Sequence, residues 1–190
     1  MSEERSLDRV LDRVEIQDVV NRWARAVDRR DFAALADLYH PDASNNQAEF
    51  VGGVDALIIR MEKRHVDIPY TQHLLGTPLV EFAGPDSALS ETSAFCTQRV
   101  RKGMPIAVGG VVPDFVGKTD VDVLTEGRYI DRFERRDGRW RIAARTTTFA
   151  WIQLLEVPDG AFQVPEGFIT GTRDRNDPLY AERAALGIVD

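Results

Sequence analysis

The chain has 190 residues, of which 43% are hydrophobic and 29% are charged, and its formal net charge at pH 7 is −7. This length and composition are typical of one globular domain with a substantial core. Because the balance is acidic and the arginines are dispersed among acids, no nucleic-acid partner is expected. No segment approaches the roughly 20 apolar residues that span a bilayer, so no membrane partner is expected either.

The N-terminal 30 residues are charged and follow a helical pattern, without the apolar segment of a secretion signal. We therefore expect a cytoplasmic location. Cys96 is the single cysteine, which excludes an internal disulfide and a cysteine-cluster metal site.

The first third of the chain predicts three helices. Residues 7–28 carry five apolar side chains at helical spacing: Ile16, Val19, Val20, Trp23 and Val27. A shorter helix is predicted over 32–39, with Asp31 as its N-cap, and the residues after His40 break its pattern. A third helix is predicted over 54–65, with His65 at its exposed end.

From Tyr70 onwards the pattern is that of strands, since β-branched and aromatic residues are frequent and turn residues separate the runs. The predicted strands are 71–83, 87–101, 120–135 and 139–152. Helices followed by strands indicate an α+β fold. The connection 103–118 is too long for a hairpin, and we expect it to form a lid. Residues 156–190 are expected to form an irregular tail that packs on the domain or on a neighbouring subunit.

Two polar side chains stand in apolar surroundings and are the best candidates for chemistry. Asp28 closes the first helix, and His73 lies near the start of the first strand. An Asp that orients a His makes the imidazole a general base near neutral pH. The alternatives are an Asp28 paired on the surface with a neighbouring arginine, and a buried His73 bonded to backbone carbonyls. Asp31 is explained by its capping role.

Other polar and aromatic residues are secondary candidates. Arg128 shares a strand face with Arg132 and could hold a leaving group or an enolate oxygen, although a salt bridge with Glu126 or another acid explains it equally well. Five aromatic residues could line a pocket or pack in the core: Trp23, Tyr39, Tyr70, Phe149 and Trp151.

Metal and cofactor chemistry lack supporting residues. His40 and His65 have no Asp, Glu or Cys at metal-ligand spacing, and no phosphate-binding glycine loop or nucleophile elbow is present. We therefore expect neither a metal nor a cofactor.

Four segments resemble the nuclear-transport-factor-2-like superfamily and, within it, the SnoaL-like proteins. They are IQD (16–18), AVDRRDF (26–32), LYHPDA (38–43) and GRYIDRFERRDGRW (127–140). The resemblance implies a cone-shaped α+β barrel, in which N-terminal helices pack on a curved, mostly antiparallel sheet and enclose an apolar pocket. Residues 1–155 would form this SnoaL-like domain.

The resemblance also implies an activity. Hexachlorocyclohexane dehydrochlorinase, scytalone dehydratase and bile-acid dehydratase carry an Asp–His pair at the positions that Asp28 and His73 match. The implied function is a cofactor-independent lyase that acts by dehydratase-type elimination on a small or medium hydrophobic molecule. An isomerase or polyketide-type cyclase with the same pair is an alternative, and a non-catalytic ligand-binding or assembly domain is another. The resemblance further implies a homo-oligomer, with a trimer favoured over a dimer.

Overall fold

The computed structural model describes residues 6–104, 117–160 and 164–188. The expected lid over 103–118 lies almost wholly outside these ranges.

The helical layer is formed by α1 (Leu7–Asp28), α2 (Phe32–Asp37) and α3 (Val54–Arg64), which continues into a short 3₁₀ helix, η2 (His65–Asp67). The predicted helices are confirmed, although the second ends two residues early. Asp31 is the N-cap of α2, as predicted, because its carboxylate accepts the Ala34 backbone N–H at 3.3 Å.

Seven strands form one sheet: β1 (Tyr39–Gln47), β2 (Phe50–Gly53), β3 (Tyr70–Leu75), β4 (Leu79–Gly84), β5 (Ser87–Val100), β6 (Asp120–Arg136) and β7 (Arg139–Val157). Their order is β2-β1-β7-β6-β5-β3, with β4 also pairing with β5. All pairs are antiparallel except β1 with β7. The sheet is therefore mostly antiparallel, as expected, but it is open rather than closed into a barrel.

The strands differ from the prediction at several places, since β2 was not predicted and β7 continues five residues beyond the predicted end at 152. The predicted strand over 71–83 is two strands, because Gly76 and Pro78 interrupt it. The helix ends before Tyr39, and Tyr39 begins β1, a strand that was not predicted and that continues through the residues after His40. Pro41 is tolerated there because the β1–β7 ladder is irregular between Tyr39 and Ser44.

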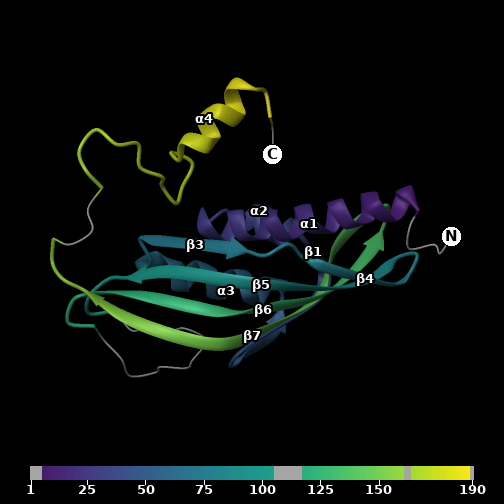
Figure 1. The fold of residues 1–190 in the computed structure, drawn as a ribbon, viewed down its shortest axis with the longest axis horizontal. Coiled ribbons are helices and arrows are strands. Elements are labelled where there is room, and N and C mark those ends of the chain that lie inside the picture. The colour runs from purple at the N-terminus through teal and green to yellow at the C-terminus, as the bar shows by residue number, and fades with distance from the viewer. Residues whose placement is uncertain (1–5, 105–116, 161–163, 189–190) are drawn as a thin grey trace.

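Helices and sheet enclose the core. Figure 1 shows α1 and α2 along one side of the curved sheet, whose strands β5, β6 and β7 run the length of the molecule. The largest fully buried side chains come from both layers, and they include Trp140, Tyr39, Phe133, Ile16 and Leu35. The expected architecture of N-terminal helices packed on a curved sheet is confirmed.

A buried charge network fixes the N-terminal half of α1 to the β6–β7 hairpin. The Asp12 carboxylate accepts hydrogen bonds from Trp140 Nε1 at 2.9 Å, from Arg135 at 2.8 Å and from Arg9 at 3.1 Å. Asp12 is 5% exposed, so its charge depends on these donors for compensation. The network sets the position of α1 along the sheet.

The sheet bends where β6 and β7 lose register, between Glu126 and Gly127. A Cβ atom at Gly127 would lie 1.9 Å from the Thr148 carbonyl oxygen, so only glycine allows this approach of the two backbones. The bend brings the middle of β6 and β7 around the space beneath α1.

The C-terminal tail packs on the C-terminal end of α1 in the same chain (Figure 1). It is not irregular throughout, because it contains α4 (Pro178–Ala185), whose N-cap Asp177 accepts the Leu179 N–H. Asp177 also pairs with Arg29 at 3.3 Å. In the part of the chain that the structure describes, no helix is long and apolar enough to cross a membrane.

Candidate active site

The structure brings Asp28 and His73 together. Asp28 Oδ1 lies 2.7 Å from His73 Nδ1, and the His73 backbone N–H donates to Asp28 Oδ2 at 2.9 Å. Both carboxylate oxygens are therefore engaged by one residue, which fixes their orientation. Because a carboxylate only accepts, Nδ1 carries a proton, and the neutral ring has its lone pair on Nε2.

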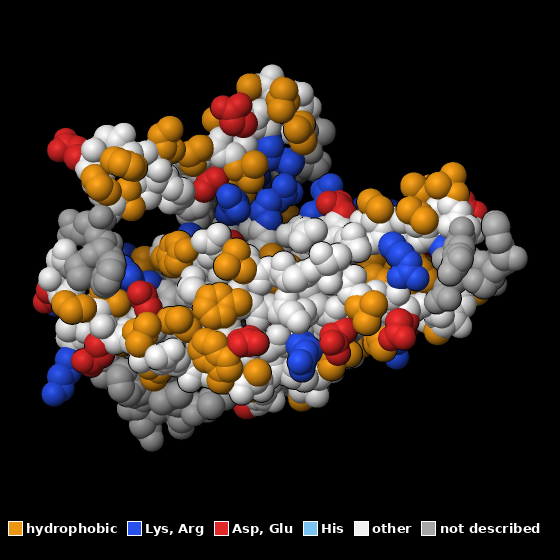
Figure 2. Space-filling view, viewed as in Figure 1, with side chains coloured by type: hydrophobic (Ala, Val, Ile, Leu, Met, Phe, Trp, Pro, Cys, Tyr) orange, Lys and Arg blue, Asp and Glu red, His pale blue; other side chains and the backbone are white. Residues whose placement is uncertain are grey.

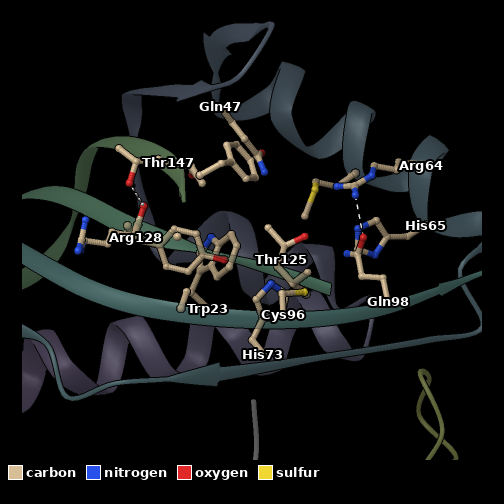
Figure 3. Close-up of a pocket in the computed structure, with 17 residues that line it drawn as sticks. Trp23, Gln47, Arg64, His65, His73, Cys96, Gln98, Thr125, Arg128 and Thr147 are labelled. Carbon is tan, nitrogen blue, oxygen red and sulfur yellow. Dashed lines mark hydrogen bonds between the residues drawn. The ribbon is translucent and has the colours of Figure 1, made fainter. Parts of the chain in front are cut away.

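His73 lies on the wall of a pocket that is lined by residues of α1, α3 and the strands of the sheet (Figure 3). The empty space between the lining side chains is about 590 Å³, including the part open to solvent. The enclosed cavity itself is small, about 50 Å³, and lies below the roughly 300–1,000 Å³ of typical ligand sites. The lining is mixed rather than purely apolar, and its polar members include Gln47, Arg64, His65, Gln98, Thr125 and Thr147. Among the described residues, no group of three or more His, Cys, Asp or Glu side chains could hold a metal ion.

Three inward-facing residues on neighbouring strands form a row at the base of the pocket. His73 on β3 is paired in register with Cys96 on β5, which is paired with Thr125 on β6. All three line the pocket, and Figure 3 shows Cys96 beside the His73 imidazole.

The environment of His73 favours its protonated form. Burial lowers the pKa of His73. The neighbouring Cys96 and the hydrogen-bonded Asp28 carboxylate raise the pKa by more than burial lowers it, and the resulting pKa is about 10. At neutral pH the free site therefore holds His73 mainly as the imidazolium. His73 can act as a base only after the imidazolium has lost its Nε2 proton.

Trp23 lines the pocket and is held from two sides. Its Nε1–H donates to the Tyr39 hydroxyl at 2.8 Å, and its ring edge packs on His73 with 5.6 Å between ring centroids. Tyr39 is 2% exposed and lies behind Trp23 in the core, not on the pocket wall. Burial raises the pKa of Tyr39 to about 12, so its hydroxyl stays neutral and can accept this bond.

A buried ion pair supports the same wall. The Arg145 guanidinium binds both carboxylate oxygens of Asp131, at 2.6 and 2.7 Å, and lies 4.2 Å from the centroid of Trp23 and 4.3 Å from that of Tyr129. Sequence reasoning missed this pair because the two residues lie on different strands. The cross-strand register that joins them depends on the hairpin.

Arg128 fits the second of the two interpretations that the sequence left open, a salt bridge with an acid, and that acid is Glu91 rather than Glu126. As predicted, it shares a face with Arg132, and both side chains are exposed, at 57% and 59%. Figure 3 shows the Arg128 guanidinium directed away from the cavity, and the side chain pairs with Glu91 at 3.7 Å. Successive strand residues face opposite sides, and the next residue, Tyr129, faces the pocket. Arg128 therefore contributes to the pocket wall only near its backbone.

The remaining aromatic candidates also divide, but Phe149 and Trp151 do so because the register shift between Glu126 and Gly127 interrupts strand alternation, which would otherwise place residues two apart on one face. Phe149 pairs with Gly127 and lines the pocket. Trp151 lies on the outer face, where it is exposed and donates to Glu126. Tyr70 is exposed at the sheet edge, and its hydroxyl bonds to Gln72. Neither Trp151 nor Tyr70 reaches this pocket.

The structure places a second polar group in the pocket that sequence reasoning missed. Arg64 donates to Gln98 Oε1 at 2.8 Å, and His65 lies beside them (Figure 3). The prediction that His65 lies at the exposed end of its helix is wrong, because its side chain is 0% exposed. The sequence did contain a signal for this burial, because His65 follows the buried Met61 by four residues and therefore lies on the same helix face.

Comparisons with known proteins agree with this architecture. A family model described as a SnoaL-like domain matches residues 8–146. A type 2 hexachlorocyclohexane dehydrochlorinase superposes with a TM-score of 0.66 at 21% identity, over 85% of this chain and 99% of that one. The type 3 enzyme from Novosphingobium barchaimii gives 0.66 at 21% identity, over 84% and 98%. A scytalone dehydratase-like protein from Novosphingobium aromaticivorans gives 0.64 at 19% identity, over 82% and 97%.

At these identities the structural likeness establishes the fold alone. No curated protein sequence matches this chain significantly. The family model, in contrast, spans most of the chain, from the first turn of α1 into β7. The chain belongs to the SnoaL-like domain family.

Proposed function

We propose that this protein is a cofactor-independent lyase that eliminates water from a small or medium hydrophobic molecule. His73 is the general base, and Asp28 orients it. The observation that carries the proposal is the bond of 2.7 Å between Asp28 Oδ1 and His73 Nδ1, with His73 on the pocket wall. The names of the similar structures, a dehydrochlorinase and a dehydratase-like protein, favour an elimination.

In the proposed reaction, deprotonated His73 takes a proton from carbon through Nε2. The electron pair of that C–H bond forms the new double bond, and the leaving group departs with its own bonding pair. Asp28 stabilises the imidazolium that results. General-base catalysis contributes roughly 10²–10⁴-fold, so positioning and electrostatics in the pocket must supply the rest.

Product analysis with a panel of hydroxylated and halogenated substrates tests this proposal. We expect His73→Ala to lower kcat/KM by roughly 10²–10⁴-fold. Arg132→Ala is the matched control, because this side chain is exposed on the outer face of the same sheet. Turnover by His73→Ala equal to that of the wild type would exclude His73 as the base.

An isomerase or polyketide-type cyclase that uses the same pair is the second candidate. The raised pKa of His73 favours it, because an imidazolium that keeps its proton can return it to the product. An isomer has the mass of its substrate, whereas dehydration removes one water, so mass spectrometry of the product separates the two. A non-catalytic binding domain would instead show ligand binding without turnover.

We also infer that the protein forms a homo-oligomer, with a trimer favoured over a dimer. The outer face of the sheet supports association, since Figure 2 shows hydrophobic side chains gathered on it. Its exposed large hydrophobic residues include Tyr70, Leu74, Leu89, Trp151 and Leu155. Light scattering gives the mass in solution, and a monomer would contradict the inference.

A further inference from the structure

His65 is a second histidine in the pocket, separate from the Asp28–His73 pair. It belongs to η2, is 0% exposed, and packs edge-on against Phe32 with 5.9 Å between ring centroids. Figure 3 shows its imidazole beside Gln98, at the end of the pocket formed by α3. His65 and His73 line the same cavity from different elements.

The C-terminal tail determines which nitrogen of His65 carries the proton. Arg173 Nη2 lies 2.7 Å from His65 Nδ1. A guanidinium can only donate, so Nδ1 must be the acceptor and carries no proton. Burial, together with the neighbouring charges of Arg64 and Arg173, lowers the pKa of His65 to about 2, so the ring is neutral. The neutral ring therefore carries its proton on Nε2.

This Nε2–H group has no hydrogen-bond partner among the described residues, although it is buried. A buried donor without an acceptor is unfavourable, and such groups in native proteins call for an explanation. An oxygen atom of a molecule in the pocket would satisfy it.

Arg173 also holds the catalytic end of α1. Its Nε donates to the Asp28 carbonyl oxygen at 2.9 Å, and its Nη2 donates to the Val27 carbonyl oxygen at 3.0 Å. Its Nη1 donates to the Ile68 carbonyl oxygen. One guanidinium thus joins the helix that carries Asp28 to the segment that carries His65. Arg173 lies outside the part of the chain that the SnoaL-like model matches.

We propose that His65 donates its Nε2–H to an oxygen atom of the substrate, and that Arg173 is the positioning residue that sets this tautomer. The inference rests on the proposed function, in which His73 takes a proton from the same molecule. An N–H donor calls for an acceptor oxygen, and, with water as the leaving group of the proposed function, a carbonyl compound with a hydroxyl group on the β-carbon meets both requirements. A purely halogenated hydrocarbon offers no comparable acceptor.

The two histidines have different roles in the proposed reaction. His73 takes the proton from the carbon next to the carbonyl, and the C–H electron pair moves so that negative charge develops on the carbonyl oxygen. His65 stabilises this charge through its N–H. The enolate then expels the β-hydroxyl, which leaves with its bonding pair and takes the proton from the His73 imidazolium. The products are an unsaturated carbonyl compound and water, and both histidines return to their initial states.

Kinetics on β-hydroxy ketones test the role of His65. We expect His65→Leu to lower kcat/KM by roughly 10²–10³-fold, as for loss of one donor to a developing oxyanion. His65→Gln, which keeps an N–H donor, should recover part of the loss. If His65→Leu matches the wild type while His73→Ala is inactive, the proposed function stands and this inference fails. If His73→Ala is active, the proposed function fails.

Nitrogen-15 NMR of the histidine rings gives a test that does not depend on turnover. We expect the wild-type protein to show His65 protonated on Nε2. Arg173→Met should remove this preference, and Arg173→Lys should keep it because lysine is also only a donor. Circular dichroism checks that each variant is folded. Protonation of His65 on Nδ1 in the wild type would overturn the inference.

Two probes of similar shape test the bond to oxygen. Cyclohexanone carries a carbonyl oxygen, and methylenecyclohexane carries a CH₂ group in its place. We expect cyclohexanone to shift the His65 Nε2–H resonance and methylenecyclohexane to leave it nearly unchanged. No shift with saturating cyclohexanone, or equal shifts with both probes, would overturn the inference.

Discussion

At the scale of single residues, the site depends on how neighbours control the protons of two histidines. Asp28 and Cys96 raise the pKa of His73, whereas burial beside Arg64 and Arg173 lowers that of His65. The same kind of side chain is thereby prepared for two different tasks in one pocket.

The raised pKa of His73 predicts a pH dependence of stability. The pKa of His73 is about 10 in the folded protein against an ordinary value of 6.5. Its contribution to stability is therefore fully present below pH 6.5 and is lost as the pH rises through about 10. We expect the difference in free energy of unfolding between wild type and His73→Gln to shrink over this interval. Urea unfolding at several pH values measures it, and a constant difference would contradict the prediction.

Cys96 predicts a shift in the pH profile of activity. Because the sulfur contributes to raising the pKa of His73, Cys96→Ala should lower that pKa. The acid limb of the profile of kcat/KM should then move to lower pH, since the basic form of His73 is available earlier. Cys96→Ser serves as a control for the loss of volume. An acid limb at the wild-type pH in Cys96→Ala would show that Asp28 alone controls the ring.

Residue-level prediction from sequence succeeded for the helix-capping Asp31 and for the meeting of Asp28 with His73. The second success came from the resemblance, because the sequence separation of two residues does not predict their contact. For Arg128 and Tyr129, strand alternation would have improved the prediction. Strand alternation predicts that these neighbours face opposite sides, so only one of them could point into the pocket.

At the scale of elements, α1 is fixed at both ends by buried charges. Asp12 binds the β6–β7 hairpin near its start, and Arg173 binds the carbonyl groups at its end. A cation at a helix C-terminus is also favourable to the helix dipole. The position of Asp28 therefore depends on contacts along the whole helix.

Removal of Asp12 should destabilise the protein strongly. Asp12→Ala leaves Arg9 and Arg135 without their shared carboxylate, and breaking a buried pair costs about 3–5 kcal/mol. Asp18→Ala on the same helix is the control, because the exposed Asp18–Arg22 pair contributes only about 0.3–0.5 kcal/mol. Thermal or urea unfolding measures both. Equal losses in the two variants would contradict this account of the network.

The elements that could be predicted were those with strong local patterns. The long strands β5, β6 and β7 and the helix α1 carry such patterns, and their predicted ranges agree with the structure to within a few residues. β1 has a polar sequence with a proline, and it forms a strand because β2 and β7 pair with it. Such tertiary pairing overrides local preference, so a single sequence does not reveal it.

At the scale of the whole molecule, the residues that line the pocket lie between positions 23 and 149, and the tail contacts one of them, His65, through Arg173. Residues 8–146 match the SnoaL-like domain, whereas Arg173 belongs to a segment beyond it. The polar composition of the tail suggested surface packing. The partly buried hydrogen bonds of Arg173 instead join one of its side chains to the end of α1 and to His65.

Removal of the tail should separate folding from function. A chain that ends at Gly160 keeps α1, the sheet and the Asp28–His73 pair, but it loses Arg173. We expect circular dichroism that differs from that of the wild type only by the loss of α4, and a large loss of activity. Full-length Arg173→Met should reproduce the loss of activity. Full activity of the shortened chain would show that the tail has no part in the reaction.

The bond from Arg173 to Asp28 spans 145 positions of the chain. Contacts of such long range are costly to close and are expected late in folding, after the helices and hairpins have formed. During synthesis the sheet can assemble before residue 173 leaves the ribosome, because chains grow at only about 5–20 residues per second. A nascent chain would then contain a folded but unfinished pocket. Under the proposed function, activity would begin only after Arg173 has emerged and bound the end of α1.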